Sequence, residues 1–296
     1  MPFKLTTAWK TDIGREREYN EDQAFAAITE NSETGLFIVA DGMGGYQAGE
    51  VASRIAVAKI RDALKRYLVP LSDQPTVKLP PLSEQGTIRL NARDDDATRK
   101  LNPEKSSVTG KTRKLPETAN VTYIEDQLKA AIRQANKTLL EYGGEQPATR
   151  GMGCTVTMAL IHNGQVHIAN IGDSRTYLRQ GKLLPLTKDH SLVAKLVETK
   201  QIDPDDMYTH PQRNLIYHAL GAGHTHVDPD VFHESLRPKD KLLLCSDGLW
   251  EMVRDPVLLK TLTEQEDLEK MCDTLIHLAN TNGGVDNISV VVVQVR

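Results

Sequence analysis

The 296-residue sequence predicts a layered α+β fold. Short runs of strand-like composition gather at both ends of the chain, and two amphipathic helical segments lie between them. That order favours sheets covered by helices over repeated βαβ units, in which strands and helices would alternate. In addition, Asn163-Gly164 separates two apolar runs, and this dipeptide is a strong signal for a two-residue hairpin turn.

The first part of the chain predicts three strands followed by two helices. Residues 3–9, 24–29 and 36–40 are short apolar or alternating runs between turn residues, which is the pattern of strands. Residues 50–68 and 125–141 carry apolar side chains at helical spacing, so that each segment predicts a helix with one apolar face.

The second part of the chain predicts further strands and two more helices. Helices are expected over residues 191–200 and 268–279, where apolar side chains recur on one face. The expected strands cover residues 155–161, 165–170, 176–179, 183–186, 241–246 and 288–295.

Residues 70–119 differ in character from both parts. This segment is rich in proline, contains no aromatic residue and has little apolar surface to offset the entropy of ordering. We therefore expect a long disordered insertion. Its role stays open between a solvated linker and a docking or regulatory segment.

The composition argues against several classes of protein. A net charge of -4 and a pI near 6.2 disfavour a nucleic-acid partner. The longest apolar runs are far shorter than the roughly 20 residues of a membrane span, and residues 1–15 lack the apolar core of a secretion signal. Cys154, Cys245 and Cys272 are an odd number without CxxC spacing, so we expect ordinary thiols, buried or partly exposed, in a cytoplasmic protein.

Acidic residues stand at the predicted ends of several strands. Taken singly, each is typical of a turn, because aspartate bonds its own backbone and a following glycine accepts positive φ. Together they would repel one another at one end of a core, and bound divalent cations would remove that cost. Carboxylate, carbonyl and water ligands suit Mg²⁺ or Mn²⁺. The acidic positions are Glu21-Asp22, Asp41, Asp173, Asp247 and Asp286.

The histidines give a weaker signal. His224-Thr225-His226 could suggest zinc, but no third and fourth ligand follow at the usual spacing and there is no HExxH motif. His190 is the histidine that we expect closest to the rim of an acidic site. The competing interpretation is that His190 only marks the start of a helix beside its cap.

At these residues the sequence resembles the PPM family, the type-2C metal-dependent protein serine/threonine phosphatases, in its compact bacterial form. The matching segments occur in the family's order and span nearly the whole chain apart from the insertion. They are TDIGREREYNED (11–22), FIVADGMGG (37–45), GCTVT (153–157), VHIANIGDSRTY (166–177), LTKDHS (186–191), RNLIYHALG (213–221), LLLCSDGLW (242–250) and DNISVVVV (286–293).

The resemblance implies a single phosphatase domain over residues 1–296 with the insertion at 70–119. The implied fold is a four-layer α-β-β-α sandwich of two antiparallel sheets flanked by helices. The implied reaction is metal-dependent hydrolysis of phosphoserine and phosphothreonine in proteins by a metal-bridging hydroxide. The implied cofactor is Mn²⁺ or Mg²⁺, two ions per chain with a third weaker site. The implied partners are phosphoproteins, including a serine/threonine kinase or its targets in bacterial signalling, and the implied state is a monomer.

The resemblance also assigns metal ligands. Asp41 would bridge both ions, Asp247 and Asp286 would complete one ion, and the Gly42 carbonyl would serve the other. Asp173 would join Asp247 at the third site. The full set of expected metal ligands, in which the first two act largely through water, is Glu21, Asp22, Asp41, Gly42, Asp173, Asp247 and Asp286.

Arg17 matches the arginine that binds the substrate phosphate, so Arg17 and Asp41 are the expected catalytic residues. Asn287 would support Asp286 from behind. Two positions depart from the family pattern. Met43 stands where many eukaryotic members have a histidine proposed as general acid, and Glu251 stands where aspartate is frequent.

Two rival interpretations remain. The glycine-rich segment from Asp41 to Gly49 could bind ATP phosphates before a helix, although the later acidic positions would then have no role and a Walker lysine is missing. A phosphatase fold could instead serve as a non-catalytic binding module. Such a protein would usually have lost one of the metal-binding carboxylates.

Overall fold

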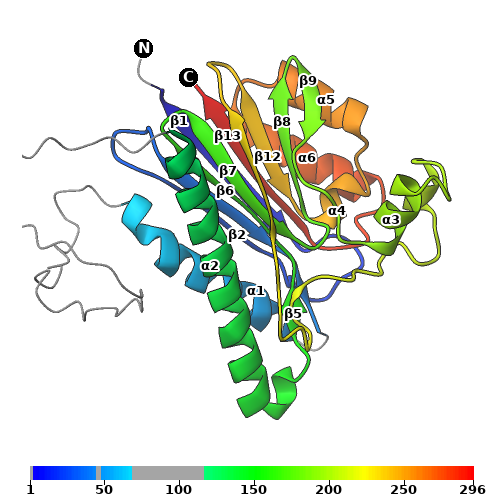
Figure 1. Ribbon diagram of the computed structural model, residues 1–296. Helices are drawn as coiled ribbons and strands as arrows, with labels where there is room; N and C mark the ends of the chain where they lie inside the picture. Colours follow the sequence, from blue (N-terminus) through cyan, green and yellow to red (C-terminus); the bar gives the residue numbers. More distant parts are fainter. Residues whose placement is uncertain (1–2, 45–47, 69–116) are drawn as a thin grey trace, which may run out of the picture.

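Two five-stranded antiparallel sheets form the centre of the protein (Figure 1). The computed structural model describes residues 3–44, 48–68 and 117–296. One sheet has the order β1 (Leu5–Asp12), β13 (Ile288–Val295), β12 (Lys241–Cys245), β8 (Arg175–Gln180) and β9 (Lys182–Pro185). The other has the order β11 (Asp230–Ser235), β7 (Gln165–Ile171), β6 (Val156–His162), β3 (Gly35–Ala40) and β2 (Gln23–Ile28).

A small third sheet adjoins the ends of the second one. It consists of β10 (Leu220–Gly221), β5 (Gly153–Cys154) and β4 (Gly42–Met43). Its central strand, β5, pairs Cys154 with both Gly42 and Leu220. This sheet therefore ties the turn after β3 to the segment that returns toward β11.

Helices cover both outer faces of the sandwich, which gives four layers (Figure 1). On the face of the second sheet lie α1 (Ala48–Leu64) and α2 (Glu117–Glu145). On the face of the first sheet lie α4 (Asp247–Trp250), α5 (Asp255–Glu264) and α6 (Leu268–Thr281). The remaining helical segments are α3 (Leu192–Glu198) and the short 3₁₀ turns η1 (Lys65–Tyr67), η4 (Pro147–Thr149) and η5 (Asp206–Tyr208).

Strand β3 explains why the layers hold together. All six of its residues are buried, because its two faces contact different cores. Phe37 and Val39 lie in the core between the sheets, whereas Ile38 and its neighbours on that face contact α1 and α2. Alternate side chains of a strand point to opposite faces, so a continuous apolar run is what a strand in an inner layer requires.

The structure confirms the predicted fold class and most predicted elements. Asn163 and Gly164 have φ values of 52° and 75°, which is the geometry of a two-residue type I′ hairpin between β6 and β7. Helix α2 begins earlier than predicted, at Glu117. Strand β11 and helix α5 were not predicted.

The predicted insertion at 70–119 falls almost entirely outside the described residues. Its last three residues, 117–119, belong to α2, so this end of the predicted insertion is wrong. Pro116 precedes the helix in the sequence, and proline commonly stands at the start of helices. Among the described residues no helix has the length and apolar character needed to cross a membrane.

Candidate metal centre and active site

The strand pairing brings the predicted metal ligands to one end of the sandwich. In the second sheet, Asp22 precedes β2 and Asp41 follows β3, and the register of these strands sets the two aspartates side by side. In the first sheet, Asp247 follows β12 and Asp286 precedes β13 at the same end. Asp173 follows β7, next to the start of β6. Carboxylates from both sheets therefore meet where the layers end.

Burial and mutual repulsion raise the pKa values of these carboxyl groups. Burial raises the pKa of Asp41 well above its usual value, and the charges of Asp22, Asp247, Asp286 and Asp173 raise it further. Burial also raises the pKa of Asp247, with Asp173 and Asp286 adding to the effect. The pKa of Asp41 is thus raised by the charges of all four other aspartates.

Three aspartates of the cluster, Asp22, Asp173 and Asp247, each have a buried carboxyl oxygen without a hydrogen-bond partner in the described part of the chain. Burial raises the pKa of Asp22 to about 7, although a hydrogen bond from the Ser246 hydroxyl at 2.7 Å opposes the shift. Burial raises the pKa of Asp173 to about 7 as well. The Oδ1 atoms of Asp22, Asp173 and Asp247 are buried and accept no hydrogen bond from the described residues. Buried polar atoms are nearly always satisfied in native proteins, so these three oxygens fit the ligand groups of a cation site.

Glu21 and Gly42 lie on the side of the cluster that faces helix α1. Glu21 Oε1 accepts a hydrogen bond of 3.1 Å from the Gly49 N–H in the first turn of α1, where a negative charge is favoured. A Cβ atom added to Gly42 would lie 2.2 Å from the Gly49 oxygen and 2.5 Å from the Glu21 oxygen. Only glycine fits at position 42, because two backbone segments pass directly against it.

Arg17 stands on the exposed rim of the cluster. Its Nη2 atom lies 2.7 Å from Asp286 Oδ2, and its side chain is 47% exposed. Burial lowers the pKa of Arg17, but the charges of Asp286, Asp247 and Asp41 outweigh it and raise the pKa. The guanidinium therefore borders the acidic centre and remains open to an incoming anion.

Asn287 ties the Arg17 loop to strand β13. Its Nδ2 donates to the carbonyl oxygens of Ile13 and Tyr19, both at 2.9 Å, and its Oδ1 accepts from the Glu21 N–H at 2.8 Å. Its own N–H donates to Asp286 Oδ1 at 2.8 Å. This buried amide thus fixes Asp286 relative to the loop that presents Arg17.

The donor set fits hard cations that keep part of their water. Among residues 3–44, 48–68 and 117–296, no group of three or more His, Cys, Asp or Glu side chains could hold an ion by itself. One of the expected ligands, Asp286, is engaged with Arg17. An ion here would therefore need water and carbonyl ligands, as Mg²⁺ and Mn²⁺ accept and as structural zinc does not. The His224 and His226 pair likewise belongs to no such group.

Two residues beside the cluster, Ser246 and Trp250, were not predicted as parts of it. Ser246 donates to Asp22 and accepts from the Ser289 N–H at 2.9 Å. Trp250 Nε1 donates to the Asp173 carbonyl at 3.0 Å. Their signal in the sequence is only their position in the motif LLLCSDGLW, because their partners lie far away along the chain.

Glu251 and His190 also have definite contacts. Glu251 forms an ion pair with Arg213 Nε at 3.4 Å, so its partner is a cation from the segment that follows α3. His190 precedes Ser191, which accepts from the Ala194 N–H as the N-cap of α3, and this position agrees with the helix-start interpretation. His190 nevertheless also contacts Gly172, next to Asp173.

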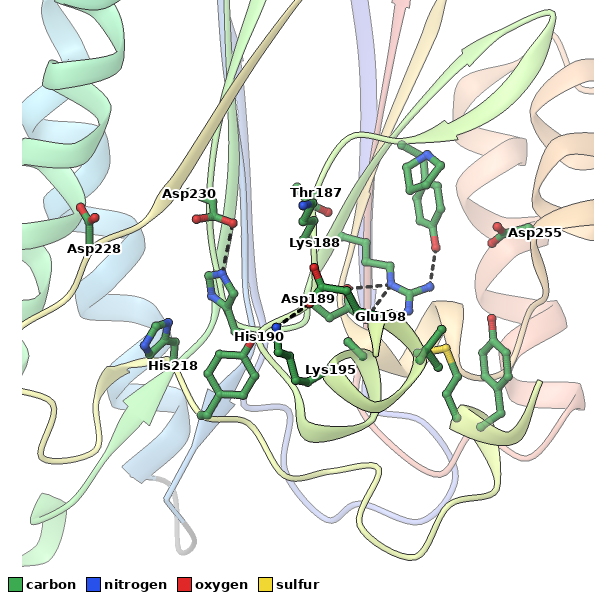
Figure 2. Close-up of a pocket in the computed structure, with 18 residues that line it drawn as sticks. Thr187, Lys188, Asp189, His190, Lys195, Glu198, His218, Asp228, Asp230 and Asp255 are labelled. Carbon is green, nitrogen blue, oxygen red and sulfur yellow. Dashed lines mark hydrogen bonds and ion pairs between the residues drawn. The ribbon is translucent and has the colours of Figure 1, made fainter. Parts of the chain in front are cut away.

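A cavity of about 820 Å³ lies against α3 (Figure 2), and none of the predicted metal ligands is among the residues that line it. Among its labelled residues, Asp189 and His190 lie between Asp230 on the left and Asp255 on the right of the view (Figure 2). Asp189 and His190 belong to the motif LTKDHS. The segment LTKDHS therefore both lines the cavity and, through His190, contacts the loop that carries Asp173.

Comparison with known proteins identifies the family of the chain. The family model of protein phosphatase 2C matches residues 14–289. The serine/threonine phosphatase stp of Listeria monocytogenes serovar 1/2a is 35% identical over 288 residues, which cover 97% of this chain and 94% of the relative.

Solved structures of phosphatases have the same fold. The crystal structure of serine/threonine phosphatase Stp1 from Staphylococcus aureus superposes with a TM-score of 0.75 at 30% identity, covering 99% of this chain and 95% of the other. The catalytic domain of the serine/threonine protein phosphatase PstP, solved in complex with two manganese ions, superposes with a TM-score of 0.71 at 30% identity, covering 99% of each chain.

The chain belongs to the protein phosphatase 2C family, in its bacterial form. It is an enzyme, a protein serine/threonine phosphatase, whose fold is shared with bacterial phosphatases of known structure. Family membership replaces the ATP-binding interpretation of the glycine-rich segment after Asp41.

Proposed function

We propose that the enzyme hydrolyses phosphoserine and phosphothreonine in proteins at a centre that holds two divalent cations. The observation that supports this is the buried group of aspartates in which Asp22, Asp173 and Asp247 each leave an oxygen without a partner. The two manganese ions of the PstP structure support Mn²⁺ as the metal, with Mg²⁺ as the alternative. Asp173 and Asp247 would hold a third, weaker ion.

When bound, such cations lower the pKa of a shared water and neutralise charge on the phosphoryl oxygens. Asp41 would contact both ions, with Asp247 and Asp286 on one and the Gly42 carbonyl on the other. The remaining acidic residues, Glu21 and Asp22, would orient water ligands.

The other residues of the site bind and orient the substrate. The Arg17 guanidinium can donate two hydrogen bonds to one phosphoryl group, which fixes the phosphorus relative to the aspartates. Asn287 keeps the Arg17 loop in place through its bonds to Ile13, Tyr19 and Glu21. Met43 has no proton to donate, so the leaving serine or threonine oxygen would take its proton from water or from another residue.

We further propose that the enzyme acts in the cytoplasm as a monomer and reverses a serine/threonine kinase in bacterial signalling. The three cysteines are free and buried, which is compatible with a reducing compartment. Phosphoproteins are the substrates that a phosphatase of this family requires. A serine/threonine kinase or its phosphorylated targets are therefore the class of partner that we propose.

The proposal is tested by hydrolysis of p-nitrophenyl phosphate and of a phosphothreonine peptide with Mn²⁺, with Mg²⁺ and with EDTA. We expect turnover of both substrates with a metal ion and none with EDTA. Turnover that is undiminished in EDTA would contradict the metal-dependent reaction. Absence of turnover from folded protein under every condition would instead favour the non-catalytic binding module.

Replacing Arg17 by alanine should mainly weaken binding of the phosphorylated substrate. A charge-assisted hydrogen bond contributes about 1.5–3 kcal/mol, so KM for a phosphothreonine peptide should rise about tenfold or more. The matched control is Arg15→Ala, two residues away in the same loop, which should leave KM within about twofold. Steady-state kinetics at saturating Mn²⁺ measure both variants, and an unchanged KM for Arg17→Ala would contradict the role in phosphate binding.

A further inference from the structure

The loop that carries Asp173 is anchored on both sides of that residue. Before it, the Gly172 N–H donates to His190 Nδ1 at 3.1 Å, and the His190 N–H donates to the Gly172 carbonyl at 2.9 Å. After it, the Ser174 hydroxyl lies 2.7 Å from the hydroxyl of Thr155. The backbone around Asp173 is therefore held by bonds to other parts of the chain.

Two further contacts complete this support. Trp250 Nε1 donates to the Asp173 carbonyl at 3.0 Å. Arg175 bonds to both carboxyl oxygens of Asp189, the shortest contact being 2.6 Å, and its guanidinium lies 3.5 Å from the centre of the Trp250 ring. Asp189 and His190, which are adjacent in sequence, thus bind the residues on either side of Asp173.

The Asp173 carboxylate itself is not part of this network. Its Oδ1 atom is buried without a hydrogen-bond partner among the described residues, and the residue as a whole is 3% exposed. The backbone around Asp173 is held by hydrogen bonds, whereas its Oδ1 atom has no partner within residues 3–44, 48–68 and 117–296. This arrangement is expected of a side chain that is preorganised to bind a ligand. The position of the Asp173 carboxylate then depends on the residues that bond to the backbone around it.

The bond from the Gly172 N–H to His190 is difficult to replace. Gly172 has φ of 104°, and a Cβ added there would lie 2.5 Å from Thr155 side-chain atoms, so this turn cannot readily relax. The Gly172 carbonyl accepts a second bond from Asn170 Nδ2 at 3.3 Å, whereas its N–H donates to His190 Nδ1. Loss of Nδ1 would leave a buried N–H unsatisfied, which is costly.

The two ring nitrogens of His190 have different partners. Because Nδ1 accepts from Gly172, the neutral ring carries its proton on Nε2, which lies 3.4 Å from Asp230 Oδ2. Figure 2 shows His190 turned toward Asp230, beside Asp189 and at the edge of the cavity. His190 therefore contacts the Asp173 loop through Nδ1 and strand β11 through Nε2.

We propose that His190 is a positioning residue for Asp173, which sets the carboxylate for the weaker divalent cation by holding the Gly172 peptide through Nδ1. The inference rests on the proposed role of Asp173 as a metal ligand. It assigns to His190 a role beyond marking the start of α3.

Two substitutions separate the two nitrogens. In His190→Asn the amide oxygen takes the place of Nδ1, so the bond from Gly172 is kept and the bond to Asp230 is lost. In His190→Gln the amide nitrogen reaches the place of Nε2, so the bond to Asp230 is kept and the bond from Gly172 is lost. Asp230→Asn, which still offers an oxygen to Nε2, serves as the control for the second contact.

The first measurement is Mn²⁺ binding to metal-free protein by titration calorimetry. Changes behind a metal ligand typically weaken metal binding by about 10–100-fold, so His190→Gln should weaken the lowest-affinity site by about tenfold or more. His190→Asn and Asp230→Asn should stay within about threefold of wild type, and Asp173→Asn should lose that site. Wild-type binding by His190→Gln, with the site lost in Asp173→Asn, would overturn the inference and leave the proposed function standing.

The second measurement does not depend on metal. Amide hydrogen exchange in the metal-free protein should show faster exchange at Gly172 in His190→Gln than in wild type and His190→Asn. Equal protection in the two His190 variants would overturn the inference. If His190→Gln does not fold, His190→Ala replaces it, because it likewise removes the acceptor for the Gly172 N–H and should weaken the same Mn²⁺ site. An Asp173→Asn variant that binds every ion like wild type would instead refute the metal role of Asp173, and the inference with it.

Discussion

Asp247→Asn is expected to reduce turnover of a phosphothreonine peptide by at least about a thousandfold at saturating Mn²⁺. Metal ions at such a site contribute several kcal/mol to transition-state stabilisation, and each 1.36 kcal/mol corresponds to a factor of ten in rate. Asparagine keeps the shape of the side chain, but it removes the charge that a cation at this position needs. The measurement is kcat at Mn²⁺ concentrations that saturate the wild type.

The same substitution should leave the metal-free fold intact. Burial and neighbouring aspartates raise the pKa of Asp247, so its charge is unfavourable without a cation. In EDTA the variant should therefore unfold at the same temperature as wild type or at a higher one. The control is Asp62→Asn, an exposed aspartate on α1, which should change neither turnover nor stability. Global unfolding of Asp247→Asn would contradict this explanation.

Arg175→Met is expected to lower the free energy of unfolding by about 3–5 kcal/mol, which is the usual cost of removing one partner of a buried ion pair. The side chains of Arg175 and Asp189 are only 11% and 5% exposed and form a bidentate pair. Without the guanidinium, the Asp189 carboxylate would remain buried without a countercharge. Urea unfolding followed by circular dichroism measures the loss.

Arg179→Met is the matched control, because Arg179 lies four residues further along β8, on the same strand, and makes only exposed contacts. Its effect should stay below about 0.5 kcal/mol. The double variant Arg175→Met/Asp189→Leu should recover part of the lost stability, since it removes the stranded charge. A double variant less stable than Arg175→Met alone would show that the ion pair is not the source of the effect.

The strands of the inner layers could be predicted from the sequence because they are buried on both faces. Strand β13 extends over Ile288–Val295 as predicted, since its long apolar run fits only a central position between two cores. Strand β11 gave no such signal, because it is a half-buried edge strand that pairs with β7 alone. Its stability comes from a neighbour that is distant in sequence.

Helix α5 was missed for a related reason. Its C-terminal end is completed by Lys241, whose Nζ donates to the carbonyl oxygens of Leu262 at 2.8 Å and Gln265 at 2.9 Å. Lys241 belongs to β12, and its side chain is directed into this contact by the tertiary fold. Such a cap from another element leaves no local pattern in the sequence of the helix.

The acidic residues of the site could be predicted as a group, because each stands next to a strand end and strand ends meet at one end of a sandwich. The residues that hold them could not. Ser246 is separated from Asp22 by 224 positions, and Trp250 and His190 act on backbone atoms of the Asp173 loop. Contacts to the backbone require no particular residue type at the partner position, so no pairing rule identifies them in advance.

The central claim is that the buried aspartates hold divalent cations around Asp41. The most direct measurement is calorimetric titration of Mn²⁺ into metal-free wild type and Asp41→Asn. We expect wild type to bind at least two ions per chain, and Asp41→Asn to lose at least one of them while remaining folded. Binding by folded Asp41→Asn with the stoichiometry and affinities of wild type would contradict the claim.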